Sequence, residues 1–228
     1  RNDLSIARFL SHEEQGLYEE EIKQFIGQAY TSLNIPEKGS NLFKVLFLHH
    51  IGIHTATLPQ LEDVVENNPE FLIGHYEDTP SIVVRSNGDS YKQNEYIAKL
   101  LTKKVNIRDF SYPWVLQGLE VKSDSNSAYG LVLVPGEKFE KIIAPDFDFG
   151  NNERKFSRIN LDYTLEWDDE GKRKLYTRDN GLSGLFMNRS LDVGSSGDHC
   201  GYSYGDGRVV VVNSAEGSRQ NFEEHIKN

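Results

Sequence analysis

Residues 181–212 read GLSGLFMNRSLDVGSSGDHCGYSYGDGRVVVV, and the composition of this stretch departs from that of the rest of the chain. From Gly184 to Asp206 it consists mainly of Gly, Ser, Asp and Tyr, and it lacks Lys, Glu, Gln, Ala, Pro and Thr. Apolar residues punctuate the stretch and its approach at Leu182, Leu185, Met187, Leu191 and Val193. This pattern predicts a backbone anchored in a core, with small and aromatic-polar side chains facing outward between the anchors.

The residue types between the anchors are typical of binding loops. Tyr gives a large contact area at low entropy cost, and Ser and Asn adapt their hydrogen bonds to a partner. The stretch therefore predicts a ligand-binding surface, and the alternative is a flexible Gly/Ser loop without a role. The regular anchors favour the binding surface, as does the adjoining β-branched run Arg208–Val212, which is typical of a central strand.

The remainder of the C-terminal half predicts short strands and turns. The strands expected there are Trp114–Val121, Tyr129–Val134 and Lys138–Ile143, followed by a hairpin of Leu161–Trp167 and Lys174–Thr177 across Asp168–Gly171. The N-terminal half is more helical. Ser11 and Glu14 form a capping box, and apolar residues at helical spacing predict an amphipathic helix from about Glu13 to Leu33.

Four further elements complete the expected secondary structure. Leu58–Glu66 and Tyr91–Lys103 are predicted helices, Ser81–Val84 is a predicted strand, and the apolar segment Leu42–Ile53 is interpreted as a buried strand. Helices early in the chain and strands late in it indicate the α+β class.

A family resemblance rests on Gly181–Leu185, Leu191, Ser195, Ser203 and Gly207–Val212, and more weakly on Leu119, Ala128–Leu131, Ala144-Pro145 and Tyr176–Arg178. These residues resemble the variable proteins of diversity-generating retroelements, which occur in phages, bacteria, archaea and their viruses. The resemblance implies a C-type lectin fold of the formylglycine-generating-enzyme type. Residues 1–40 would then form an N-terminal helical segment, and residues 41–228 a ligand-binding domain with a variable region at about 181–212.

Diversification in that family acts on adenines of a template, often in Asn codons. Changing the first two letters of an AAC codon reaches Gly, Ser, Asp, Tyr, His, Arg and Phe, among others, but not Lys, Glu, Gln, Met or Trp. Every residue from Gly184 to Asp206 except Met187 is reachable, and Met187 occupies an apparent scaffold position. The composition of the stretch therefore agrees with such a mechanism.

The resemblance also divides the stretch into two sets of residues. The implied scaffold residues are Leu182, Ser183, Leu185, Met187, Leu191, Val193, Ser195, Ser203, Gly207 and Arg208. The implied displayed, ligand-binding residues are Gly184, Phe186, Asn188, Arg189, Ser190, Asp192, Gly194, Ser196, Gly197, Asp198, His199, Tyr202, Tyr204, Gly205 and Asp206.

Within the displayed set the large side chains are expected to dominate binding, because aromatic residues and Arg are the usual hot spots. They are Phe186, Arg189, His199, Tyr202 and Tyr204. Cys200 departs from the family pattern, in which an aliphatic residue is usual, and we interpret it as a small buried thiol.

Charge and cysteine content narrow the classes of partner. A net charge of −10 and scattered basic residues argue against nucleic acid, which needs clustered Lys and Arg. No apolar run approaches the roughly 18 residues of a transmembrane helix, so membrane insertion is not expected. Cys200 is the only cysteine, so no intrachain disulfide can form, which favours a reducing compartment or a virion. We expect a soluble protein, either intracellular or on a virion or cell surface.

Metal and enzyme interpretations find less support. His50 and His54 would share a face of a strand, but without a recognised zinc spacing. Asp146–Glu153 alternates oxygen ligands but places Gly150 where a calcium loop needs Asp or Asn, so a solvated turn is favoured. Ser183 and Ser195 lie in no nucleophile elbow, and no phosphate loop is present. We therefore expect no enzyme, no metal and no cofactor.

Two function classes remain open. The first is a diversified binding protein that recognises a protein or cell-surface ligand. The alternative is a conventional calcium-dependent lectin or a minor structural protein of a virion. The oligomeric state is left open by the sequence.

Overall fold

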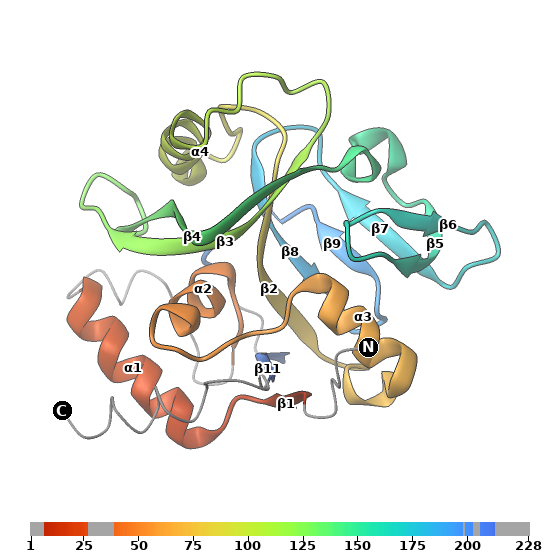
Figure 1. Ribbon diagram of the computed structural model, residues 1–228, viewed down its shortest axis with the longest axis horizontal. Helices are drawn as coiled ribbons and strands as arrows, with labels where there is room; N and C mark the ends of the chain where they lie inside the picture. The colour runs from red at the N-terminus through yellow and green to blue at the C-terminus, as the bar shows by residue number, and fades with distance from the viewer. Residues whose placement is uncertain (1–6, 27–38, 198, 203–205, 213–228) are drawn as a thin grey trace.

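The computed structural model describes residues 7–26, 39–197, 199–202 and 206–212. Within them the chain forms one nine-stranded mixed sheet and a small two-stranded sheet (Figure 1). The large sheet runs in the order β4-β3-β2-β8-β9-β7-β5-β6, with β10 paired to β2. Its strands are β2 (Tyr76–Val84), β3 (Trp114–Ser123), β4 (Leu131–Ile143), β5 (Lys155–Ile159), β6 (Leu165–Trp167), β7 (Arg173–Thr177), β8 (Leu182–Met187), β9 (Val193–Ser195) and β10 (Gly207–Arg208).

Most neighbouring strands are antiparallel, and the β7–β9 and β2–β10 pairs are parallel. The small sheet pairs β1 (Ala7–Phe9) with β11 (Val210–Val212). The helices are α1 (His12–Ile26), α2 (Leu42–His50), α3 (Leu58–Asn67) and α4 (Lys92–Lys104), with short 3₁₀ turns η2 (Pro69–Phe71), η3 (Pro145–Phe147) and η4 (Phe149–Asn151). The α+β class and the N-terminal helix are confirmed.

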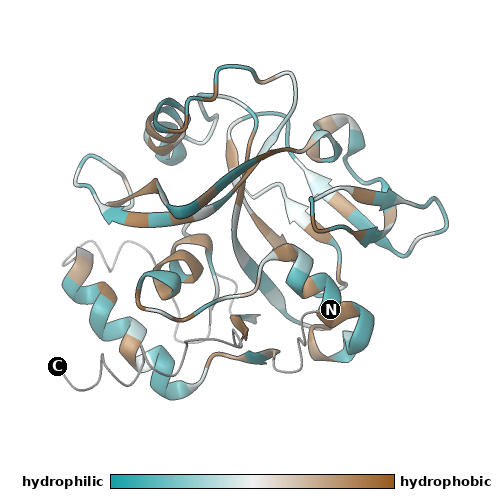
Figure 2. Cartoon of the chain, viewed as in Figure 1, coloured by the Kyte–Doolittle hydropathy of each residue, from teal (hydrophilic) through white to brown (hydrophobic). Residues whose placement is uncertain are grey.

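Both faces of the central strands are buried, because successive side chains of a strand point to opposite faces. Val84 and Leu116 belong to a core that includes α2 and α4, whereas Val83 and Val115 belong to a second core with α3 and η3. Figure 2 shows the hydrophobic segments concentrated where β2, β3 and α2 meet, with hydrophilic segments at the periphery. The sheet therefore separates two apolar cores, and β8 and β9 lie within it between β2 and β7.

The predicted strand at Leu42–Ile53 is wrong, because Leu42–His50 forms helix α2. Asn41 caps this helix by accepting a hydrogen bond from the Lys44 N–H at 2.9 Å. Residues 42–48 are all buried, since α2 lies against β2 and β3 and is covered by α1 (Figure 1). A helix that is buried all round lacks the one-sided apolar stripe, so an apolar run alone does not distinguish it from a strand.

Three predictions in the C-terminal half also need correction. The two segments expected on either side of Pro135 form the single strand β4, which Pro135 interrupts little because β4 is an edge strand. The expected hairpin of β6 and β7 does not form, because β5 lies between them and pairs with both. The run expected as one central strand at 208–212 divides into β10, beside β2, and β11, beside β1.

The other predicted elements are confirmed with small changes at their ends. The Ser11–Glu14 capping box forms, with the Glu14 N–H donating to Ser11 Oγ at 3.2 Å and the Ser11 N–H donating to a Glu14 carboxylate oxygen at 2.9 Å. The expected continuation of this helix to Leu33 lies outside the described residues. β2 starts at Tyr76, five positions before the expected Ser81. Its start escapes sequence patterns because Pro80 interrupts it, at the register shift between Asp78 and Ile82.

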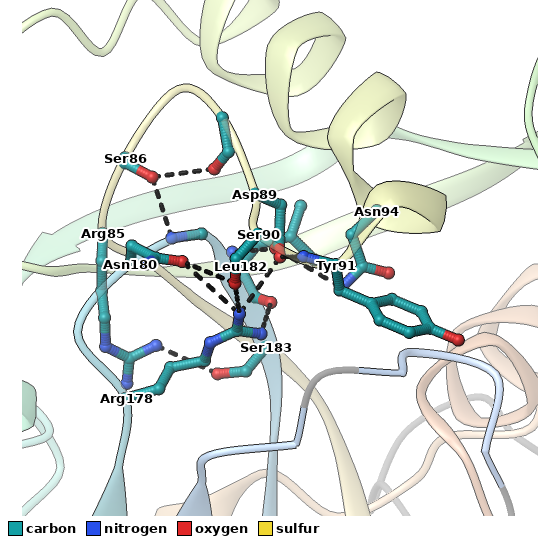
Figure 3. Close-up of polar contacts among 12 residues, drawn as sticks. Arg85, Ser86, Asp89, Ser90, Tyr91, Asn94, Arg178, Asn180, Leu182 and Ser183 are labelled. Carbon is teal, nitrogen blue, oxygen red and sulfur yellow. Dashed lines mark hydrogen bonds and ion pairs between the residues drawn. The ribbon is translucent and has the colours of Figure 1, made fainter.

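A buried arginine joins the middle strands of the sheet. The guanidinium of Arg85, directly after β2, donates to Ser183 Oγ at 3.1 Å (Figure 3). The same group donates to Thr177 Oγ1 and Ser195 Oγ, both at 2.6 Å. It also donates to the carbonyl of Phe147 at 3.4 Å. Burial lowers the pKa of Arg85 to about 9. One cation thus ties β2 to β7, β8, β9 and η3 through oxygen acceptors alone.

Replacing this cation should destabilise the fold strongly. We expect Arg85→Ala to lower the free energy of unfolding by about 3 kcal/mol, because it removes several buried hydrogen bonds and leaves a cavity. Urea denaturation measures the change. The matched control is Arg158→Ala, whose ion pair with Glu66 is half-exposed and should contribute less than about 1 kcal/mol. Equal losses in the two variants would contradict the role given to Arg85.

Glu77 is a second buried ionisable group and should make stability depend on pH. It is 1% exposed, and neither carboxyl oxygen has a hydrogen-bond partner among the described residues. Burial raises the pKa of Glu77 well above its ordinary value of 4.5, with a further contribution from Asp78 and an opposing one from Arg208. The free energy of unfolding is highest below the pKa that Glu77 has in the unfolded chain, where the carboxyl is neutral in both states. It falls as the pH rises through the pKa of Glu77 in the folded protein.

We therefore expect Glu77→Gln to be more stable than the wild type at pH 8, by roughly 1 to 3 kcal/mol, and this advantage to shrink towards pH 4.5. Denaturant unfolding over that pH range measures it. Glu166→Gln, at an exposed position, should show no such trend. A pH-independent difference between Glu77→Gln and the wild type would refute the assignment.

Candidate functional site

A pocket of about 270 Å³ opens where β2 and β8 meet Gly197 and residues 199–202. Several of the residues expected to be displayed border it, together with residues of β2 and the first turn of α2. The lining residues are Leu42, Tyr76, Asp78, Gly184, Phe186, Gly197, His199, Cys200 and Tyr202.

The alternation of β8 decides which of its side chains face the pocket. Gly184 and Phe186 line the pocket, whereas Leu185 and Met187 are fully buried in the core on the opposite face. Gly184 also lies against α2, because a Cβ placed on it would be 3.7 Å from the Cβ of Leu42. From Ser183 to Met187, the residues expected as scaffold and as displayed thus alternate with the two-residue period of a strand.

The approach to β8 is held by Asp89, whose side chain is fully buried. Its carboxylate accepts the N–H groups of Tyr91 and Leu182, both at 2.8 Å, and pairs with Arg178 at 3.1 Å (Figure 3). Gly181 has a φ of +72°, and any Cβ there would meet an Asp89 oxygen at 2.3 Å. Glycine is therefore required at position 181 for the chain to enter β8 beside Asp89.

The turn between β8 and β9 uses two of the expected displayed residues for its own hydrogen bonds. The Asn188 side chain accepts the N–H groups of Ser190 and Asp192 and donates to the Asp192 carboxylate. Asp192 also accepts the Lys174 N–H at 2.7 Å and is 7% exposed. Arg189 and Ser190 project from the tip of this turn and are exposed.

Aromatic rings surround the segment 199–202. The His199 ring lies 5.3 Å from the rings of both Tyr91 and Tyr129 and 6.4 Å from that of Tyr202. Its Nδ1 accepts the Gly201 N–H at 3.1 Å, and the Gly201 carbonyl accepts from the Asn41 amide at 3.5 Å. These contacts fix His199 beside the pocket while Tyr202 remains 56% exposed.

The rim near the β8–β9 turn carries a cation. The Arg189 guanidinium lies 5.4 Å from the centre of the Tyr76 ring and forms an ion pair with Asp206. Phe186 approaches Tyr76 with 6.2 Å between ring centres, and its ring covers Gly194 so closely that a Cβ there would meet it at 2.2 Å. Gly194 is therefore buried beneath a displayed ring.

Asp78 supplies the acidic group of the pocket. It is paired with Phe186 in the β2–β8 register, so its side chain shares the face of Tyr76 and Phe186. Burial raises the pKa of the Asp78 carboxyl to about 6, and a hydrogen bond from the Ser40 side chain partly opposes the rise. Asp78 therefore carries a desolvated carboxyl group next to aromatic rings.

The expected displayed residues divide into several environments. Those exposed are Arg189, Ser190, Ser196, Gly197 and Tyr202, and those half-buried are Gly184, Phe186, Asn188, His199 and Asp206. Asp192 and Gly194 differ from the expectation because both are buried, the first by the turn and the second by the Phe186 ring. Asp198, Tyr204 and Gly205 lie outside the described residues.

The expected scaffold residues are mostly buried, with Arg208 half-buried and Ser203 outside the described residues. Ser183 and Ser195 are the hydroxyl partners of Arg85, which gives their positions a physical reason. Cys200 is 5% exposed, so its interpretation as a buried thiol is confirmed.

Sequence reasoning missed the part of the pocket that lies far away in the chain. Leu42, Tyr76 and Asp78 precede the variable stretch by more than a hundred positions. Only the pairing of β2 with β8 and the packing of α2 bring them to the pocket. The sequence at 76–80 has no alternation of apolar and polar residues that could have marked this part of the strand.

In the histidine segment 49–54 and in the acidic segment 146–153, which were considered as metal sites, side chains form hydrogen bonds within the protein. His49 lies on a helix rather than a strand, and its Nε2 accepts the Thr55 N–H at 2.8 Å. Burial lowers the pKa of His49 to about 4. The Asp146 carboxylate accepts the Leu165 N–H at 2.7 Å and the Trp167 indole N–H at 3.1 Å. In the described part of the chain, no group of three His, Cys, Asp or Glu side chains is arranged to hold a metal ion.

No helix in the described ranges combines the length and apolarity that a bilayer crossing requires. Comparison of the chain with protein-family models, with curated proteins and with solved structures finds no match.

Proposed function

We propose that this chain is a ligand-binding protein that displays a retroelement-diversified surface on a C-type lectin scaffold and recognises a macromolecular target. The observation that carries the proposal is the composition of the pocket wall. Gly184, Phe186, Gly197, His199 and Tyr202 border one pocket, and all are residues that changes in an Asn codon can reach.

The separation of changeable from constant positions supports this function. Leu185 and Met187 complete the core on one face of β8 while Phe186 faces the pocket on the other. Substitutions at the pocket positions therefore alter the surface without altering the core. A protein that tolerates many sequences at a binding face needs such a division.

The same geometry favours binding over thiol or histidine catalysis. Cys200 is buried, and Nδ1 of His199 is engaged by the Gly201 N–H. The exposed groups are instead Tyr, Arg and Ser side chains, which provide contact area and hydrogen bonds. These groups suit a protein surface as the partner.

Substitution tolerance should follow the division along β8 and its neighbours. We expect Tyr202→Ser to change the free energy of unfolding by less than about 0.5 kcal/mol, because the side chain is largely exposed. Leu185→Ser, the matched change at a buried position, should cost about 3 kcal/mol or more. Denaturant unfolding compares them, and similar costs in both variants would remove the distinction between displayed and scaffold residues.

The gene itself provides the decisive test of diversification. The nucleotide sequence around it should contain a near-copy of the stretch that encodes Gly184–Asp206, beside a reverse-transcriptase gene. Mismatches between the copies should fall at adenines of the template, in codons of displayed residues. If neither a second copy nor a reverse transcriptase is found, the diversified-surface proposal is rejected.

A further inference from the structure

The pocket contains one acidic side chain that does not belong to the variable stretch. Asp78 lies on β2, opposite Phe186 of β8, and its side chain lines the pocket. Because it lies outside residues 181–212, diversification of that stretch leaves it unchanged. Every variant of the surface would therefore present a carboxylate at the same point of the pocket.

Among the residues that the structure describes, no basic side chain is paired with this carboxylate. Arg189 at the rim pairs with Asp206 instead. Asp78 is half-buried and has a hydrogen bond from Ser40 but no ion pair among the described residues, so its carboxylate gains from a proton or from a nearby cation. The raised pKa of Asp78 has this cause, since burial is its largest contribution.

The walls around Asp78 are those that attract organic cations. Tyr76, Phe186 and Tyr202 line the same pocket, and a cation over such an aromatic ring is stabilised by the ring quadrupole. The rim offers an example within the chain, because the Arg189 guanidinium lies 5.4 Å from the centre of the Tyr76 ring. A carboxylate among aromatic rings selects a positively charged group with an apolar stem.

The size of the pocket restricts the ligand group further. Its volume of about 270 Å³ is below the roughly 300–1,000 Å³ of sites that enclose whole small molecules. It suits one long side chain inserted from a larger partner. Leu42 at the wall adds an apolar surface for the methylene stem of such a side chain.

We propose that this pocket binds the cationic side chain of a lysine or arginine on the protein ligand, with the Asp78 carboxylate as its counter-charge. The inference rests on the proposed binding function and names a contact that all variants share. The variable residues around the pocket then select the sequence and shape surrounding that cation.

The test uses the whole protein, labelled with ¹⁵N, and three blocked amino acids as probes. N-acetyl-lysine methylamide and N-acetyl-arginine methylamide carry the cation, and N-acetyl-norleucine methylamide has a similar stem without charge. We expect both cationic probes to shift the backbone amide signals of Gly184, Phe186 and Gly197, with at least tenfold weaker binding of the norleucine probe. n-Butylamine tests whether the stem and ammonium suffice, and we expect it to bind at the same signals more weakly than the lysine probe.

Two variants of equal charge change identify the counter-charge. Asp78→Asn should weaken binding of the lysine probe at least tenfold, whereas Glu137→Gln, at an exposed position of β4, should leave it unchanged. If Asp78→Asn does not fold, the comparison of lysine with norleucine in the wild type still decides the outcome. Equal binding of charged and neutral probes, or no shift at the pocket signals, would overturn the cation proposal. Such a result leaves the diversified-surface proposal intact, because that depends on the template copy in the gene.

Discussion

The buried guanidinium of Arg85 is the contact on which the arrangement of the middle strands depends. It reaches hydroxyl groups on β7, β8 and β9 and a carbonyl of η3, and these groups also bond to one another. A buried cation needs oxygen acceptors at fixed distances, so small polar residues are required at Ser183 and Ser195. Because Ser183 lies on the face of β8 opposite Gly184 and Phe186, Arg85 holds the strands of the candidate binding face from the side away from the pocket.

The face in front of that frame has a different physical character. Phe186, His199 and Tyr202 are held at their backbones by strand pairing and by the contacts of residues 199–202, while their side chains border open space. Asn188 and Asp192 show that some polar residues of the stretch serve the backbone instead, since their side chains close the β8–β9 turn. Composition alone does not distinguish the side chains that border the pocket from those that form hydrogen bonds within the turn.

Two neighbouring acids on β2 have opposite environments because a strand alternates its faces. The Glu77 carboxyl is enclosed and without a hydrogen-bond partner among the described residues, and Asp78 opens to the pocket. Burial raises the pKa of both groups. At Glu77 the raised pKa makes the stability of the fold depend on pH. At Asp78 the same burial favours the approach of a positively charged ligand group, as we propose.

The sequence was sufficient to predict the α+β class, helices near 12–26, 58–67 and 92–104, and the apolar anchors of the stretch at 181–212, because these depend on local periodicity and capping. It did not determine whether Leu42–His50 is a helix, since a fully buried segment shows no polar face. The placement of β5 between β6 and β7, and of β2 beside β8, depends on long-range strand pairing that is visible in the folded chain alone. The pocket likewise depends on long-range packing. Strand pairing and helix packing bring Leu42, Tyr76 and Asp78 to the same pocket as Phe186 and His199, and no local sequence pattern contains this information.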